Sequence, residues 1–576
     1  MLQKTPKWLI ILIAVIIVAI PAAIIGLIWL PDYLAPVETS STDTSWITLP
    51  DEELTALREK QAEEAEAAAL AASKKAAEEE YEATHDSPSQ GMITIESCLI
   101  EESYVTLHLT CEIMPKSDDN MYHVFAQAVY ESGTEGTEAA SGDEGTDIDL
   151  SFALGTGTAD SMLDKKFVVC VLSDGEYIAV SDSHYITNPE EAAYKTTARN
   201  DNGKKGILPA ASMLSSGELA NLGTDQCLYN VKLGNLCSGS GIDYAYNGKT
   251  YSFSSSVINE LDIVVSRLNS QEIQVTFVLL VNSGCTTLIH PESRSGSAYY
   301  YAFNTADSDG VALLSAVASF LADRYSGGAY GTVDNWIVGN EINARGEWHY
   351  MSDIGSTAFT DEYAKAFRIF YNGIKSTNAN ARVYISLDQQ WSVSQDTSKY
   401  YTARDVLQIF NDNIALEGNI DWHVAIHPYD VPLTDPKVWT SSDSVTHSND
   451  TAVITMQNID VLTDFLGQDE FLSNGEVRSV LCSEVGYTSS DGQETQAAAV
   501  VYSYLQCMAN QHIDGIILSR ELDDSSEVAQ GLSLGIYGKT AWTYYKNIDT
   551  DDAQAYIDKA SAIIGVDDMT TLITER

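Results

Sequence analysis

Positive charge is scarce in this chain of 576 residues. It has 32 lysines and arginines against 82 aspartates and glutamates, and its formal net charge at pH 7 is −50. Nucleic acids and anionic lipid surfaces are bound by clusters of lysine and arginine, so the composition argues against both as partners. The acidity favours general solubility, and it also suits a surface exposed to a variable medium.

Metal-binding and cofactor-binding motifs are missing as well. The eight cysteines form no C-x-x-C pair, which argues against a zinc knuckle or a thioredoxin-like site. No expected strand is followed by a G-x-G-x-x-G or Walker loop, and H-E-x-x-H is absent. The segments DSDG (307–310) and DDSS (523–526) lack a full calcium ligand series and are expected to be turns or helix caps. We therefore expect no cofactor and no metal.

The cysteines lie mostly in apolar runs, such as KFVVCVL and LCSEV, which is typical of small buried side chains. Disulfides are nevertheless possible in an oxidising compartment. Cys98 with Cys111, and Cys227 with Cys237, are the candidate pairs.

One long hydrophobic run is present near the N-terminus. Residues 8–30 read WLIILIAVIIVAIPAAIIGLIWL, and about 23 residues at ~1.5 Å each span roughly 34 Å, enough to cross a bilayer core of about 30 Å. A cleaved signal peptide is the alternative, although its apolar region is normally shorter and a small-residue cleavage site should follow. We expect an uncleaved transmembrane anchor. Lys4 and Lys7 precede it, so residues 1–7 are expected in the cytoplasm and the bulk of the chain outside the cell.

Three segments of different composition follow the anchor. Residues 31–50 are a Ser/Thr/Pro-containing spacer, and residues 51–84 are rich in Ala, Glu and Lys, which predicts a solvated helical stalk. Residues 92–189 contain short runs of alternating apolar and polar residues, which predict strands and a β-sandwich-like accessory domain.

From residue 198 to about 560, short apolar strands alternate with amphipathic helical stretches. Strands buried on both faces and separated by helices indicate a parallel sheet, and eight such units predict a (β/α)8 TIM barrel, hence an α/β fold class. A doubly wound open sheet is the alternative. The eight expected strands lie within residues 206–211, 226–233, 275–281, 335–343, 382–390, 421–429, 479–487 and 514–522.

Two of these strands end in a glutamate. The fourth ends in GNEIN, with Asn340 and Glu341, and the seventh ends in CSEVGY, with Glu484. Polar residues at the carboxyl ends of barrel strands face the active site. Two carboxylates facing each other there can cleave a glycosidic bond, one protonating the leaving oxygen and the other attacking the anomeric carbon.

The segment from about residue 200 to 550 resembles clan A of the glycoside hydrolases. These (β/α)8 barrels carry an Asn-Glu acid/base at the end of strand four and a nucleophilic Glu at the end of strand seven. The resemblance implies Glu341 as general acid/base, Glu484 as nucleophile, and Asn340 as hydrogen-bond partner of the sugar 2-hydroxyl. It also implies roles near the nucleophile for His427 and Tyr429, in the HPYD that ends strand six.

Aromatic residues after the strands are candidate sugar platforms, because the apolar face of a pyranose stacks on a π-surface. Trp348, His349 and Trp391 are placed for this, as are Tyr299, Tyr300 and Tyr301. Strand eight departs from the clan pattern: it ends in LSREL where many members have Trp, so Arg520 or Glu521 takes that place.

The sequence thus predicts a membrane-anchored, extracytoplasmic, retaining glycoside hydrolase acting on poly- or oligosaccharide. A carbohydrate-binding or scaffold protein on a degenerate barrel is the alternative from another class. A polysaccharide lyase or esterase lacks its expected constellation of residues. The oligomeric state stays open.

Overall fold

Eight parallel strands close into a barrel in the computed structural model, which describes residues 51–440 and 442–576. The predicted (β/α)8 barrel is therefore confirmed, and the open sheet is excluded because β11 pairs with β20 to complete the ring. In order around the ring, the strands are β11 (Lys205–Ile207), β12 (Gln226–Lys232), β15 (Gln274–Leu280), β16 (Asn335–Val338), β17 (Arg382–Asp388), β18 (Trp422–His427), β19 (Val480–Val485) and β20 (Ile513–Leu518).

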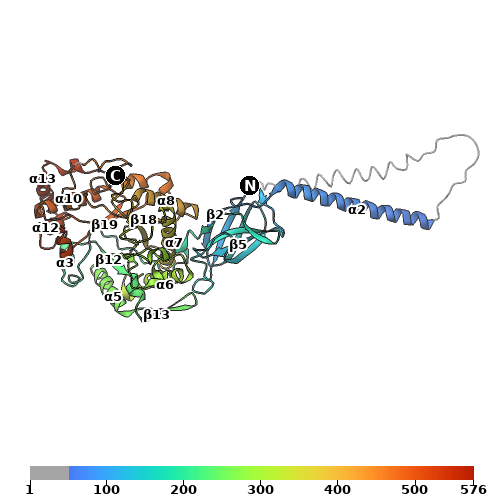
Figure 1. The fold of residues 1–576 in the computed structure, drawn as a ribbon, viewed down its shortest axis with the longest axis horizontal. Helices are drawn as coiled ribbons and strands as arrows, with labels where there is room; N and C mark the ends of the chain where they lie inside the picture. Colours follow the sequence, from blue (N-terminus) through green and yellow to red (C-terminus); the bar gives the residue numbers. More distant parts are fainter. Residues whose placement is uncertain (1–50, 441) are drawn as a thin grey trace, which may run out of the picture. The chain divides into compact units, whose positions relative to one another are not determined.

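Helices follow the strands and surround the ring, as Figure 1 shows for α5, α6, α7, α8 and α10. Side chains cap two of them: Ser254 accepts from the N–H of Val257 at α5, and Asp307 accepts from Gly310 at α6. The helices are α3 (Glu218–Leu222), α4 (Leu233–Cys237), α5 (Ser255–Asn269), α6 (Ser308–Arg324), α7 (Ser356–Lys375), α8 (Ala403–Leu416), α9 (Asp460–Leu466), α10 (Gln493–Ala509), α11 (Ser525–Val528), α12 (Thr540–Asn547) and α13 (Ala553–Ile564). A hairpin of β13 (Gly241–Tyr246) and β14 (Lys249–Ser254) precedes α5.

The barrel has two hydrophobic layers, which explains its uninterrupted apolar strands. Leu228, Val278, Ile337, Leu481 and Ile517 belong to a cluster of inward-facing residues that fills the ring. The alternate residues of the same strands pack outward against the helices in a second, larger cluster. Each strand is thus buried on both faces, as parallel strands in barrels are.

Residues 85–187 form antiparallel sheets. One contains β10, β8, β5 and β6 with β9 attached, and another contains β2, β3 and β7. The short strands β1 and β4 form a separate, parallel pair. Buried residues of the two larger sheets belong to one core, including Val105, Leu107, Val124 and Val169. The strands are β1 (His85–Asp86), β2 (Thr94–Glu101), β3 (Tyr104–Thr110), β4 (Met114–Pro115), β5 (Met121–Gln127), β6 (Thr137–Asp143), β7 (Asp147–Ala153), β8 (Lys166–Ser173), β9 (Glu176–Ala179) and β10 (His184–Tyr185).

This β-domain is joined to the barrel by polar contacts with α7 and with the end of α8. The amide of Asn372 donates to the carbonyl of Leu163 (2.9 Å), and the N–H of Tyr185 donates to the carbonyl of Glu417 (2.8 Å). The guanidinium of Arg368 lies 4.7 Å from the centre of the Tyr185 ring. The interface therefore contains specific, buried contacts.

Residues 51–84 form a single exposed helix, α2 (Asp51–Thr84), with i,i+4 ion pairs Lys60–Glu64 and Lys75–Glu79. Across the two described stretches of the chain, no helix is both long and apolar enough to cross a membrane. The predicted anchor at residues 8–30 and the spacer at 31–50 lie outside the described residues.

The two disulfides considered from the sequence are not formed, since all eight cysteines are free. Cys98 pairs across the sheet with Leu107, whereas Cys111 follows Thr110, whose partner is Thr94, so the two cysteines are separated by about four residues along the strands, roughly 13 Å. Cys227 lies at the start of β12, while Cys237 ends α4 beyond the other end of that strand.

Candidate active site

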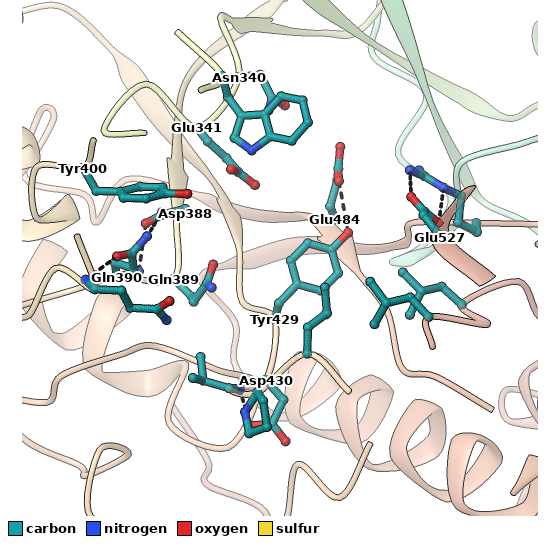
Figure 2. A pocket seen from close by; sticks show the side chains of 18 of the residues that line it. Asn340, Glu341, Asp388, Gln389, Gln390, Tyr400, Tyr429, Asp430, Glu484 and Glu527 are labelled. Atoms are coloured by element: carbon teal, nitrogen blue, oxygen red, sulfur yellow. Dashed lines mark hydrogen bonds and ion pairs between the residues drawn. The ribbon is translucent and has the colours of Figure 1, made fainter. Parts of the chain in front are cut away.

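Glu341 and Glu484 project into one cavity at the carboxyl ends of the barrel strands. Figure 2 shows their carboxylates pointing into this space from opposite sides. The cavity has a volume of about 570 Å³, and Asn340, Tyr429 and Arg520 also line it. The barrel topology thus brings together residues that are more than 140 positions apart in the sequence (341 and 484).

His427, the last residue of β18, contacts both glutamates. Its Nδ1 lies 2.6 Å from Oε1 of Glu341 and 3.9 Å from Oε2 of Glu484. Because both distances start from the same nitrogen, the two carboxylate oxygens are at most about 6.5 Å apart. This upper limit is compatible with the separation of about 5–5.5 Å in retaining glycosidases.

The imidazole of His427 is buried, with 3% of its side chain exposed. Burial by itself lowers the pKa of His427, but the charge of Glu484 and the hydrogen bond and charge of Glu341 outweigh it, so the pKa is raised. The charge of Asp388 acts in the same direction. His427 is thereby stabilised as a cation between the two carboxylates.

Tyr429 holds Glu484 from the neighbouring loop, its hydroxyl donating to Oε2 at 3.1 Å (Figure 2). Burial and the charge of Glu484 raise the pKa of Tyr429 well above its usual value, so the phenol keeps its proton. Gly486 lies beside this ring and makes room for Ser519, since a Cβ there would lie 2.4 Å from Oγ of Ser519 while only touching Cε1 of Tyr429 at 3.4 Å. The hydrogen bond leaves the other carboxylate oxygen free for substrate.

The backbone around both glutamates is irregular. Cys482 pairs with Ile516 and Val485 with Leu518, so β19 has one residue more than β20 in this interval, a bulge that includes Glu484. Such bulges re-aim side chains next to active sites. Glu341 has a φ of 39°, which costs about 1–3 kcal/mol, and its N–H donates to Oγ of Ser386 at 3.0 Å. Both carboxylates are therefore positioned by local departures from regular strand geometry.

Asp388, at the end of β17, is a site residue that the sequence analysis missed. Its Oδ1 accepts from Nδ2 of Asn343 (2.6 Å) and from the N–H of Gln390 (2.8 Å), and Oδ2 accepts from the Gln390 side chain (2.7 Å). Burial, followed by the charge of Glu341, raises the pKa of Asp388 to about 6. The signal was present, because LDQQ places an acid where barrel strand five ends.

Asn340, Trp348 and Arg520 line the cavity as their strand positions suggested. The guanidinium of Arg520 is engaged by Glu527, with Nε 3.1 Å from Oε2 and Nη2 2.5 Å from Oε1. This two-pronged pair largely neutralises the charge of Arg520 within the cavity. Glu521 does not take the place of the clan's tryptophan: it is buried and accepts from the N–H of Ala210 at 2.8 Å.

Trp391 is not a sugar platform, and this prediction was wrong. The side chain is 0% exposed, its Nε1 donates to the carbonyl of Asn449 (3.1 Å), and the Phe465 ring packs against it at 5.0 Å. His349 and Tyr301 are likewise buried. The side chain of a residue just beyond a strand can pack between the barrel and its helices, and only the tertiary structure shows whether it does.

The chain does contain a G-x-S-x-G motif, GLSLG (531–535), although the sequence was expected to lack this esterase signature. In esterases the serine of this motif lies on a sharp turn between a strand and a helix. Here residues 529–539 are a loop between α11 and α12, and Ser533 donates its N–H to Oγ1 of Thr488 at 3.0 Å. The motif is therefore part of a structural turn.

Carboxylates of the calcium-like segments cap helices, as expected. Asp307 accepts from the N–H of Gly310 and Asp524 from the N–H of Ser526. Among the residues that the structure describes, no group of three or more His, Cys, Asp or Glu is arranged to hold a metal ion.

The solved structures that resemble this chain are glycoside hydrolases with little sequence identity. A family 39 glycoside hydrolase from the gut symbiont Bacteroides cellulosilyticus WH2 is 13% identical with a TM-score of 0.42, over 79% of this chain and 81% of that one. A hyperthermophilic β-glucosidase from Pyrococcus furiosus is 13% identical with a TM-score of 0.40, over 62% and 88%. A β-glucuronidase from Bacteroides uniformis is 11% identical with a TM-score of 0.37, over 80% and 50%, so the chain spans half of that enzyme.

These likenesses are too distant to assign an activity to this chain. No curated protein sequence matches it. Residues 197–572, which include all eight barrel strands and the helices around them, match the model of a family of unknown function, DUF5722. Since this is more than half of the chain, the protein belongs to the family DUF5722.

Proposed function

We propose that this protein is a retaining glycoside hydrolase in which Glu341 is the general acid/base and Glu484 the nucleophile. The observation that carries the proposal is the pair of carboxylates on barrel strands four and seven, in contact with one buried histidine. The upper limit of about 6.5 Å on the separation of their oxygens supports direct attack on an anomeric carbon, for which retaining enzymes use about 5–5.5 Å.

In the first step, Glu484 attacks the anomeric carbon while the bond to the leaving oxygen breaks and Glu341 protonates that oxygen. In the second step, water attacks the glycosyl-enzyme ester, Glu341 accepts a proton from that water, and Glu484 is released. Asn340 is placed to bind the sugar 2-hydroxyl. Tyr429 and His427 are positioning residues that act through Glu484 and Glu341.

Glu341→Gln and Glu484→Gln test the assignment on a panel of aryl glycosides. We expect Glu484→Gln to abolish turnover, and Glu341→Gln to lower kcat/KM by about 10²–10⁴-fold for poor leaving groups. The loss in Glu341→Gln should be smaller for dinitrophenyl glycosides, whose leaving oxygen needs no proton. Glu476→Gln, in an exposed turn, is the matched control and should leave turnover unchanged.

Retention is checked by following the anomer of the first product by NMR and by trapping the ester on Glu484 with a 2-fluoro glycoside. Inversion of the anomer would contradict the nucleophilic role of Glu484. Full turnover in both glutamine variants would overturn the whole assignment.

The alternative is a barrel that binds carbohydrate without cleaving it. The observation that favours it is the end of strand eight, where Arg520 is paired with Glu527 in place of an aromatic sugar platform. Glycan binding by the wild-type protein, without hydrolysis of any aryl glycoside, would select this alternative.

We further propose that the enzyme acts outside the cell, on external or cell-wall carbohydrate, and that residues 8–30 anchor it in the membrane with residues 1–7 in the cytoplasm. The apolar length of that run and Lys4 and Lys7 before it support this location.

A further inference from the structure

The catalytic cavity extends to both sides of the glutamate pair. In the closed ring, β17 and β18 lie on one side between the strands of Glu341 and Glu484, and β20, β11, β12 and β15 lie on the other. Residues from both arcs line the cavity: Gln389, Gln395 and Leu433 on the first side, and Asn230 and Tyr300 on the second. A ligand that fills the cavity therefore passes between the two carboxylates, with parts on either side of them.

Two further hollows adjoin the cavity. Asn230 and Tyr300 also line a hollow of about 460 Å³ that extends outward to α5, over Tyr229 and Lys232. Trp348 also lines a hollow of about 450 Å³ whose other walls include Tyr299 and Glu347. Because each shares side chains with the catalytic cavity, the space available to a ligand is larger than a single sugar ring.

Three aromatic rings form a wall where these spaces meet. The Tyr299 ring stacks on Trp348 with centroids 5.4 Å apart and planes at 23°, and Tyr300 is tilted against Trp348 at 6.3 Å. The two loops that carry these rings are joined by the hydrogen bond from the N–H of Tyr350 to the carbonyl of Tyr300 (3.0 Å). Tyr299 is nonetheless 75% exposed, so one face of its ring is free to stack on a sugar.

The charge of the catalytic cavity selects against anionic sugars. Carboxylates of Glu341, Asp388, Asp430, Glu484 and Glu527 line it. Among the described residues that line it, Arg520 is the only one with a positive charge, and Glu527 already neutralises that charge. A uronic acid placed here would meet like charges without a free cation to balance its own.

We infer that the substrate is an uncharged glycan chain bound across the glutamate pair, with the Tyr299–Trp348 wall as a further sugar subsite, and that the chain is cleaved internally. This inference rests on the proposed hydrolase function. It adds the substrate class and the mode of attack to that function.

The test uses reducing-end-labelled oligosaccharides from disaccharide to hexasaccharide. Neutral β-1,4-linked gluco-, manno- and xylo-oligosaccharides are compared with oligogalacturonides, and the products are identified by mass spectrometry. For at least one neutral series we expect internal products and a kcat/KM that rises about tenfold or more with length, whereas oligogalacturonides should show no cleavage. Tyr299→Ala should lower kcat/KM for the longer oligosaccharides by about tenfold, which is the effect expected for the loss of one aromatic platform.

Tyr104→Ala, which removes an exposed tyrosine of the β-domain, is the matched control and should leave the length gain intact. Calorimetric titration of Glu484→Gln with the same oligosaccharides measures binding without turnover. Its affinity should increase with oligosaccharide length, and this increase should disappear in the double variant Glu484→Gln/Tyr299→Ala. Release of sugars from one chain end only, preference for oligogalacturonides, or an unchanged length gain in Tyr299→Ala would overturn the inference. Failure of the proposed function itself is distinguishable, because aryl glycoside turnover would then be absent from the wild type or would survive Glu341→Gln and Glu484→Gln.

Discussion

At the scale of single residues, the site depends on the ionic contact between His427 and Glu341, in which the histidine side chain is almost fully buried. His427 touches Glu341 directly and has Glu484 and Asp388 in its surroundings. Each of these groups favours the protonated imidazole, and together they outweigh the effect of burial. The histidine thereby reduces the mutual repulsion of carboxylates that the reaction requires close together.

His427→Gln should change how stability depends on pH. Because the folded-state pKa of His427 is raised, its contribution to the free energy of unfolding is fully present below the unfolded value of about 6.5 and is lost as pH rises through the folded pKa. Urea unfolding over this window should therefore show a loss of stability in the wild type, with a smaller loss in the variant. His512→Gln serves as control, and identical pH slopes in wild type and His427→Gln would contradict the raised pKa of His427.

At the scale of elements, the strands were predictable and the loops between them were not. Each of the eight expected strands overlaps an observed one, because a strand buried on both faces is an apolar run bounded by polar turns. Glu341 and Glu484 follow from that count, since their position at strand ends depends only on the order of the strands. The loops contact one another through side chains that are far apart in sequence. No repeating pattern of apolar and polar residues predicts such contacts.

One such contact joins the loops after β16 and β17. The N–H of Gly346 donates to the carbonyl of Lys399 (2.7 Å), and Glu347 binds Lys399 (2.8 Å) and the hydroxyl of Tyr400, which lines the cavity. Burial tends to raise the pKa of Glu347, but the hydrogen bonds from Lys399 and Tyr400 outweigh this and lower it, so the carboxylate stays ionised. This wall of the site is therefore held by interactions between loops.

Gly346→Ala should separate these loops, because a Cβ there would lie 2.9 Å from Cα of Lys399. We expect a loss of about 1 kcal/mol of unfolding free energy and a fall in kcat/KM of about 10–100-fold, since misplaced cavity residues cost rate steeply. Thermal unfolding and kinetics on an aryl glycoside measure both effects. Gly467→Ala, where the nearest atom would be 3.3 Å away, is the control; equal activity of the two variants would argue against this coupling.

At the scale of the whole molecule, the β-domain and the barrel share a polar, buried interface. Arg368 donates from Nη2 to the carbonyls of Ile414 (2.8 Å) and Gly418 (2.6 Å) and lies against Tyr185 of the β-domain. Burial lowers the pKa of Arg368, while the charge of Glu417 opposes this. Only Nη2 of Arg368 is satisfied by these carbonyls, because its Nε and Nη1 and the hydroxyl of Tyr185 are buried without a hydrogen-bond partner, so the ring contact with Tyr185 also helps to hold the guanidinium at the interface.

The proposed anchor gives a prediction at the same scale. Deletion of residues 1–50 should move the protein from the membrane fraction to the soluble fraction while aryl glycoside turnover stays within about twofold, because the barrel site is built from residues after 200. Cell fractionation with an antibody against the barrel measures this. Protease added to intact cells should also digest the barrel of the full chain; protection from protease, or an unchanged distribution after deletion, would contradict the proposed location.

The sequence alone determined the (β/α)8 architecture and the candidate glutamate pair, because both depend on local apolar runs and on their order along the chain. Only the tertiary structure decided which aromatic rings reach the cavity, that Asp388 joins the site, and that Glu527 neutralises Arg520. Trp348 and Trp391 look alike in sequence, each just beyond a strand, yet one lines the cavity and the other is in the core. The physical reason is that the direction of a loop side chain depends on packing against residues far away in the sequence. The position of a strand depends on the local run of apolar residues that forms it.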